Sequence, residues 1–262
     1  MGTTSILDSM VKDSLLLKVK DWWSSQKLDT VNDYMTVLEN FRIIFTCNSN
    51  MIEGSEVTYH TTRDVFEGNN ITGYTGPLTD LLQIQNQKFA FNFLVESLVE
   101  KRELDLDFIK KLHKIMLHGC YDDRRYNKGE RPGKFKVHDY CVGTTDVGSL
   151  PEDVLYDVVD LVEEVNEMRD FSLNHILTTV AYFHLRFESI HPFADGNGRV
   201  GRTLMNYLLM LYGLPPIVIF NEDREVYYMA LEVWDRTGEI SGFIEFLKEQ
   251  LIKTWKSKVG DN

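Results

Sequence analysis

One stretch of twelve residues holds much of this chain's reactive chemistry. Residues 191–202 read HPFADGNGRVGR and combine an imidazole, a carboxylate, an amide, glycines and two guanidinium groups. Gly196 and Gly198 allow backbone N–H groups to turn inward at the start of a helix, which makes an anion-binding nest that the helix dipole reinforces. Arg199 and Arg202 are three residues apart, so they share one helix face and can hold successive phosphates.

His191 and Asp195 supply the other parts of a phosphoryl- or nucleotidyl-transfer site. Asp195 offers a hard oxygen ligand suited to Mg²⁺, which normally takes one or two carboxylates together with phosphate oxygens and water. His191 precedes it by four residues, and a neutral imidazole can accept a proton from an attacking hydroxyl at physiological pH. Each part alone is more often a turn or a packing residue. Their combination within twelve residues predicts a phosphoryl- or nucleotidyl-transfer site.

Other motifs for nucleotide, zinc or serine chemistry are weak or missing. Gly196, Gly198 and Gly201 also spell the dinucleotide pattern Gly-x-Gly-x-x-Gly, but that pattern needs a preceding strand. The residues before it, 173–190, have helical periodicity instead. No Walker A, HExxH or GxSxG pattern occurs in the chain.

Helices are the elements predicted to position this segment. Apolar residues recur at helical spacing through 173–190 and again from Val200 to Leu211, so two helices flank residues 191–198. Further helical stripes cover residues 15–45 (with a break near 28–30), 78–99, 107–118 and 151–168. These patterns predict an all-α, mainly helical protein.

Residues 131–148 are the only strand-like part of the chain. Phe135 and Val137 alternate with lysines, and Tyr140 and Val142 follow after a polar pair. Because a two-stranded hairpin is marginal alone, it must lean on the helical body, and its free edge could pair with an incoming peptide. The segment is therefore a candidate substrate clamp.

Length and charge limit the remaining possibilities. A chain of 262 residues fits one domain with an appendage. Its net charge of −12 predicts no nucleic-acid or membrane partner, and any phosphate ligand needs local cations such as those in 191–202. Cys47, Cys120 and Cys141 lie far apart, which favours a reducing compartment. With no export, lipidation or membrane-spanning pattern visible, we expect a cytoplasmic protein.

Residues 191–202 match the signature of the Fic family, His-x-Phe-x-Asp/Glu-Gly-Asn-Gly-Arg-x-x-Arg, at every specified position. Residues 181–190 and 224–231 are also similar to that family. The resemblance implies a Fic fold, with a helical core and a short β-hairpin flap. It also implies an N-terminal helical region over residues 1–95 and a catalytic core over 96–262.

The resemblance further implies transfer of AMP from ATP to a Ser, Thr or Tyr hydroxyl of a target protein, and of the chain itself, with Mg²⁺ as cofactor and pyrophosphate leaving. His191 corresponds to the general base and Asp195 to the magnesium ligand. The implied nucleotide contacts are Gly196, Asn197 and Gly198 at the α-phosphate, Arg199 at the β-phosphate, Arg202 at the γ-phosphate, and Tyr227 or Tyr228 beside the adenine. The implied target-aligning flap is Val137, His138, Asp139, Tyr140, Cys141 and Val142.

A second motif resembles the family's inhibitory pattern, Ser/Thr-x-x-x-Glu-Gly/Asn. It runs from Ser49 through Glu53 to Gly54 and lies before the signature, as in class II members with an N-terminal inhibitory helix, here near 48–56. Glu53 would pair with Arg202 and occupy the place of the γ-phosphate, with Ser49 holding the helix or the glutamate.

Three alternatives stay open at this point. Glu53 could orient a water that removes AMP from a modified target, or the enzyme could transfer another nucleotide or phosphate-containing group. A non-catalytic nucleotide-binding module is less favoured, because binding alone needs no proton acceptor at His191. The oligomeric state is open, with a homodimer as one option.

Overall fold

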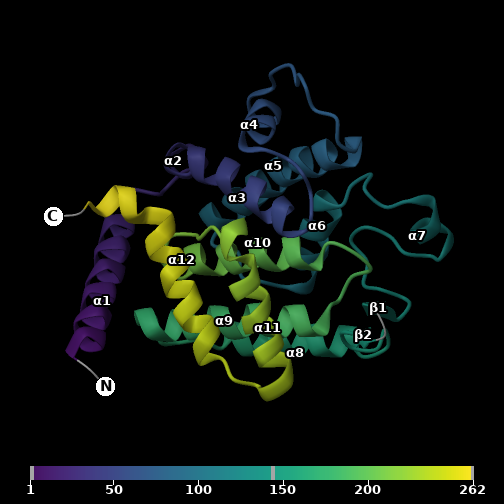
Figure 1. The fold of residues 1–262 in the computed structure, drawn as a ribbon. Coiled ribbons are helices and arrows are strands. Elements are labelled where there is room, and N and C mark those ends of the chain that lie inside the picture. Colours follow the sequence, from purple (N-terminus) through teal and green to yellow (C-terminus); the bar gives the residue numbers. More distant parts are fainter. Residues whose placement is uncertain (1–2, 143–144, 261–262) are drawn as a thin grey trace.

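The computed structural model describes the backbone of residues 3–142 and 145–260, and the side chains of 10–140 and 148–260. The architecture is mainly helical, as the sequence predicts (Figure 1). The helices are α1 (Thr3–Ser24), α2 (Val31–Val37), α3 (Glu39–Ile52), α4 (Tyr59–Glu67), α5 (Leu78–Val99), α6 (Leu106–Met116), α7 (Asp123–Asn127), α8 (Val154–Asn166), α9 (Leu173–Ile190), α10 (Asn197–Leu211), α11 (Arg224–Thr237) and α12 (Ser241–Val259). A 3-10 turn, Asn221–Asp223, precedes α11. The described strands are β1 (Tyr140–Val142) and β2 (Thr145–Val147), which pair antiparallel.

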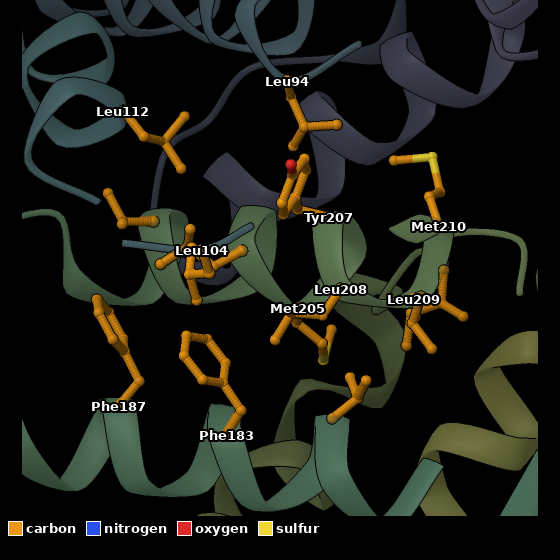
Figure 2. Packing of buried hydrophobic residues seen from close by; sticks show 14 of the residues in the cluster. Leu94, Leu104, Leu112, Phe183, Phe187, Met205, Tyr207, Leu208, Leu209 and Met210 are labelled. Atoms are coloured by element: carbon orange, nitrogen blue, oxygen red, sulfur yellow. The ribbon is translucent and has the colours of Figure 1, made fainter. Parts of the chain in front are cut away.

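Helix α10 lies at the centre of the fold and carries residues 197–202, the second half of the segment 191–202 (Figure 1). All its residues from 199 to 210 are buried. Phe183 and Phe187 of α9 point toward α10 from one side, while Leu94 of α5 and Leu112 of α6 approach from the other (Figure 2). Because a helix covered on all sides cannot shift without disturbing the core, α10 is a rigid support for its own first turn.

The first and last helices pack together on the side of the molecule away from the flap and α7 (Figure 1). Helix α1 runs along α12, and the rings of Trp22 and Trp255 lie 4.8 Å apart between their centroids. One buried apolar cluster extends from Leu16 to Trp255, so it crosses the expected boundary near residue 95. The division into 1–95 and 96–262 stays a prediction. No helix in the described ranges combines the length and apolar character needed to cross a membrane.

The inhibitory-like motif does not form a separate helix over 48–56. It lies at the end of α3, which stops at Ile52, with Glu53 as the C-terminal cap residue. Gly54 follows with a φ of +88°, a left-handed conformation that ends helices and favours glycine. The stripe over 31–45 is also two helices, because α2 ends and α3 begins around Leu38.

The hairpin is shorter than its sequence pattern suggests. Tyr140 pairs with Val147, whereas Phe135 and Val137 join no strand of the described sheet. The reason is that the backbone there bonds to the catalytic segment instead: Lys136 N–H donates to the Pro192 carbonyl at 2.9 Å. On the other side of the hairpin, Ser149 N–H donates to the Ile190 carbonyl at 2.9 Å. The flap is thus anchored on both sides to the junction between α9 and α10.

Candidate active site

The junction between α9 and α10 fixes His191 in an unusual conformation. His191 caps α9 with φ 50° and ψ 60°, in the left-handed region that residues other than glycine rarely adopt. At the other end of the loop, Gly196 has a φ of +84°, and a Cβ there would press into Leu117. Backbone strain of this kind persists only where the surrounding structure enforces it, and it often marks functional positions.

Asn197 holds this loop and does not face a ligand with its side chain. Its Oδ1 accepts from Phe193 N–H at 2.9 Å, and its Nδ2 donates to the Phe193 carbonyl at 2.8 Å. Both polar atoms are therefore engaged and the residue is buried, so the expected contact of Asn197 with the α-phosphate stays a prediction that its backbone N–H would fulfil. What Asn197 offers is a backbone N–H in the first turn of α10.

The start of α10 is a ready-made anion site. Helix α10 has no side-chain cap at Gly196, and Val200 N–H makes the first intrahelical bond, to the Gly196 carbonyl at 3.0 Å. The N–H groups of Asn197, Gly198 and Arg199 precede that bond, as expected for the first turn of a helix. Uncapped N–H groups together with the helix dipole favour a phosphate or carboxylate at this position.

His191 is neutral at physiological pH. Burial, and after it the nearby Lys136 cation, lower the pKa of its imidazole to about 4. The ring is also hydrogen-bonded to the Glu188 carbonyl. A ring that donates there presents its other nitrogen as an acceptor, which is the state that a general base needs.

Asp195 lies between two arginines. Its Oδ1 is 3.2 Å from Nη2 of Arg199, and its Oδ2 is 3.3 Å from Nη2 of Arg125 on α7. The carboxylate side chain is 31% exposed, so it remains accessible to a ligand. The sequence analysis missed Arg125, because its partner is distant in the chain.

Asp195 and its neighbours fit Mg²⁺ only if a bound nucleotide supplies further oxygen ligands. Among the described residues, no group of three or more His, Cys, Asp or Glu side chains could hold a metal ion. A single accessible carboxylate suits Mg²⁺ when phosphate oxygens and water complete its coordination. Asp195 is the residue that would hold the ion.

Arg202 is fully engaged by the inhibitory-like motif. Its Nε donates to Ser49 Oγ at 3.1 Å, and its Nη2 donates to the Ser49 carbonyl at 2.9 Å. The same Nη2 is 2.7 Å from Glu53 Oε1. The carboxylate also lies directly over Gly198, where an added Cβ would collide with Glu53 Oε1. The Glu53 carboxylate therefore lies beside the first turn of α10.

Glu53 carries a negative charge in this position. Desolvation raises the pKa of its carboxyl group, but the charges of Arg202 and Arg199 outweigh that effect and hold the pKa below its ordinary value. The side chain is still 33% exposed, so it can leave without unpacking the core.

The two tyrosines on α11 have different surroundings. Tyr227 is 1% exposed, and its hydroxyl is 2.9 Å from His184 Nε2. It is a core residue that packs 6.0 Å from the Arg202 guanidinium, which corrects the expectation that it could flank an adenine. Tyr228 is 45% exposed and donates to the Ile52 carbonyl at 3.2 Å, so it stays the candidate for the residue that flanks the adenine.

His113 on α6 links the catalytic loop to the flap. Its Nδ1 accepts from Gly133 N–H at 2.7 Å, so the proton is assigned to Nε2, which lies 3.0 Å from the Asp195 carbonyl. The ring stacks on Phe193 with centroids 3.7 Å apart. Burial lowers its pKa to about 3, so it remains neutral. The sequence analysis missed it, and its one signal was a histidine within the apolar stripe of α6.

Glu130 holds the base of the flap. It is buried, and its Oε1 accepts from Val137 N–H at 3.2 Å and from the Tyr140 hydroxyl at 2.9 Å. Val137, His138 and Asp139 are exposed beside it. Of the six expected flap residues, the side chains of Cys141 and Val142 lie outside the described residues.

Comparison with known proteins identifies this arrangement. Residues 103–209 match the sequence profile of the Fic/DOC family. The protein adenylyltransferase Fic of Drosophila persimilis is 32% identical over 209 residues, covering 78% of this chain and 38% of that protein. The chain belongs to the Fic family. The Nematostella vectensis protein of the same name is 31% identical over 212 residues, covering 76% of this chain and 44% of its own.

Solved structures confirm the Fic fold. A Fic domain containing signaling protein from Bacteroides thetaiotaomicron superposes with a TM-score of 0.79 at 24% identity, covering 94% of this chain and 95% of that one. Fic-1 from C. elegans gives 0.74 at 23% identity, covering 98% of this chain and 74% of that one. This Fic protein spans about two fifths of the length of the curated relatives it matches.

Proposed function

We propose that this Fic protein transfers AMP from ATP to a hydroxyl group of a target protein, and to itself, and that Glu53 restrains the reaction. The observation that carries the proposal is the start of α10, where an uncapped helix end, two arginines and a neutral histidine meet. The name of the curated relatives, protein adenylyltransferase, supports the same chemistry.

The residues of this site would perform two tasks: they would position the phosphates and accept a proton from the target hydroxyl. The target hydroxyl oxygen attacks the α-phosphorus of ATP, His191 accepts its proton, and the bond from that phosphorus to the bridging oxygen of the leaving pyrophosphate breaks. Backbone N–H groups of Gly198 and Arg199 would stabilise charge on the α- and β-phosphates. Mg²⁺ held by Asp195 would neutralise phosphate charge and act as a Lewis acid.

The restraint is competition between two anions for Arg202. The Glu53 carboxylate pairs with Arg202, the residue assigned to the γ-phosphate, so ATP would bind productively only after Glu53 moves. A hydrogen bond to a charged group contributes about 1.5–3 kcal/mol, which corresponds to roughly 10- to 100-fold in an equilibrium. Removing Glu53 alone then leaves Arg202 free to bind phosphate.

The test is AMP incorporation from α-labelled ATP with Mg²⁺, measured on the full chain and on proteins of a lysate. We expect Glu53→Gly to raise incorporation by about 10- to 100-fold. Glu56→Gly is the matched control, because this neighbouring acid forms no ion pair with any described residue. Adding His191→Ala to Glu53→Gly should abolish the label.

Each outcome has a clear meaning. Equal labelling of the parent and Glu53→Gly would reject the restraint, and label that survives His191→Ala would reject the assigned base. If the parent instead removes AMP from a labelled target and Glu53→Gly loses that ability, the reverse reaction is the main activity. Competition by unlabelled UTP or CTP tests the preference for ATP.

A further inference from the structure

A second charged site lies beside the flap, apart from the residues that would grip the triphosphate. It is a cavity of about 250 Å³ between α7 and the start of β1. Its lining residues are Asp122, Arg124, Arg125, Lys128 and Tyr140. Three cations and one acid meet here in a chain whose net charge is −12, so this pocket is a local exception to the repulsion of anions.

The positive charge of the pocket is not neutralised within the described part of the chain. Asp122 pairs only with Arg125, at 3.3 Å. The exposed side chains of Arg124 and Lys128 form no ion pair with a described residue. Nε of Arg125 is buried without a hydrogen-bond partner among those residues. Two cations are therefore available to an incoming anion.

The pocket is connected both to Asp195, through Arg125, and to the flap, through Tyr140. Asp195 separates the two arginines that flank it: Arg199 lies on α10 beside Glu53, whereas Arg125 lies on α7 and lines the pocket. Tyr140 lines the pocket as well and is the first residue of β1. The described sheet has two strands, so a segment added along the outer edge of β1 would end next to this pocket.

We propose that this pocket binds an acidic side chain of the target protein, close in sequence to the hydroxyl that receives AMP. The inference rests on the proposed function and adds a substrate preference to it. Because exposed ion pairs are individually weak, two of them give a preference of about fivefold and not an absolute requirement. Acidic segments are selected even though the rest of the surface repels them.

The experiment uses two peptides that differ only in charge. Both carry one central threonine, flanked by glutamates in one peptide and by glutamines in the other. Binding is measured by fluorescence anisotropy on the Glu53→Gly/His191→Ala chain, which cannot react, and AMP transfer is measured on the Glu53→Gly chain. Each is repeated with Arg124→Glu/Lys128→Glu. The control pair, Lys18→Glu/Lys27→Glu, makes the same charge change at exposed lysines on α1 and just after it.

We expect the glutamate peptide to bind about fivefold tighter than the glutamine peptide at low salt, in line with two exposed ion pairs. Arg124→Glu/Lys128→Glu should remove or reverse that preference, and the control pair should keep it. Equal binding of both peptides to the parent, no binding of either, or a preference that survives Arg124→Glu/Lys128→Glu would overturn the proposal. So would a loss of ATP affinity with the peptide preference intact, because the pocket would then serve the triphosphate.

Failure of the proposed function gives a different result. If the glutamate peptide binds preferentially and the pocket substitutions abolish that preference, yet no AMP is transferred to peptide, lysate protein or the chain itself, the pocket stands and the AMP-transfer assignment fails.

Discussion

The two arginines at the start of α10 are held in opposite ways. Arg202 is buried and makes three hydrogen bonds to Ser49 and Glu53, so its side of the site is filled by the chain's own carboxylate. Arg199 has one ion pair at 3.2 Å, to an Asp195 carboxylate that is 31% exposed. The Asp195 side is thus partly exposed, whereas the Arg202 side is covered by the Glu53 carboxylate.

The burial of Arg202 explains why its guanidinium needs a negatively charged partner at all times. A buried guanidinium without a negative partner is strongly destabilising. Glu53 supplies that partner, and under the proposed function the γ-phosphate of ATP would replace it. The same argument predicts that changes on the Asp195 side lower activity, while changes on the Glu53 side raise it.

The largest effect is expected from Asp195→Asn in the Glu53→Gly background. The asparagine keeps the size of the side chain but removes the one carboxylate beside the expected triphosphate, so AMP incorporation should fall by about 100-fold. Initial rates measured against Mg²⁺ concentration should show partial recovery at high Mg²⁺. Asp122→Asn is the matched control, because Asp122 also pairs with Arg125 but is the N-terminal cap residue of α7, outside the loop of residues 191–197. Equal losses in both variants would contradict a special role for Asp195.

For His113→Ala, also in the Glu53→Gly background, we expect a smaller loss of AMP incorporation, about tenfold. The substitution leaves Gly133 N–H and the Asp195 carbonyl without their hydrogen-bond partner. His113→Gln can restore the donor to the Asp195 carbonyl, and His113→Asn can restore the acceptor for Gly133 N–H. We expect the glutamine variant to recover the Mg²⁺ dependence of the rate better than the asparagine variant. The exposed His118→Ala serves as control. If Gln and Asn recover only melting temperature, and to the same extent, His113 has no positioning role toward Asp195.

The parts of the site that lie close in sequence were predictable, and the parts that meet across the fold were not. The apolar stripe over 173–190 predicted α9 with its observed bounds. His191, Asp195 and Arg199 are brought together by one short loop, so chain proximity alone places them. His113 and the Asp195 carbonyl are 82 residues apart in sequence, and no local pattern distinguishes this histidine from a packing residue.

The same limit explains why the surroundings of Asn197 and Tyr227 could not be predicted from the sequence. Asn197 resembles a ligand residue in the motif, but the tight turn uses both of its polar atoms to hold Phe193. Tyr227 and Tyr228 are equivalent in sequence, and only the packing of α11 decides that one is buried against Arg202 and the other exposed. Burial of a particular helix face is a property of the whole fold.

On the Glu53 side, Ser49→Ala should raise AMP incorporation by about fivefold, the effect of losing one ordinary hydrogen bond. The alanine removes the 3.1 Å bond from Arg202 Nε but keeps the bond to the backbone carbonyl of residue 49. The rates of the parent, Ser49→Ala, Glu53→Gly and the double variant form a double-mutant cycle. We expect no further gain from Ser49→Ala once Glu53 is absent, and Ser25→Ala, outside the site, should change nothing. A decrease in rate would show that Ser49 supports the active state instead.

The smallest effect concerns pH and the contact between the flap stem and the catalytic loop. The pKa of His191 is lowered to about 4, first by burial and then by the Lys136 cation, so the base is neutral above that pH and becomes protonated as pH falls through it. Lys136→Met removes the cation and raises the pKa of His191, which protonates more of the base in acid. We expect the Glu53→Gly/Lys136→Met chain to lose less than about a factor of five in rate at pH 5, relative to Glu53→Gly, and little at pH 8. Lys134→Met, an exposed lysine of the same stem, is the control. An equal loss at both pH values would mean that Lys136 acts by holding the flap stem, and not through the charge state of His191.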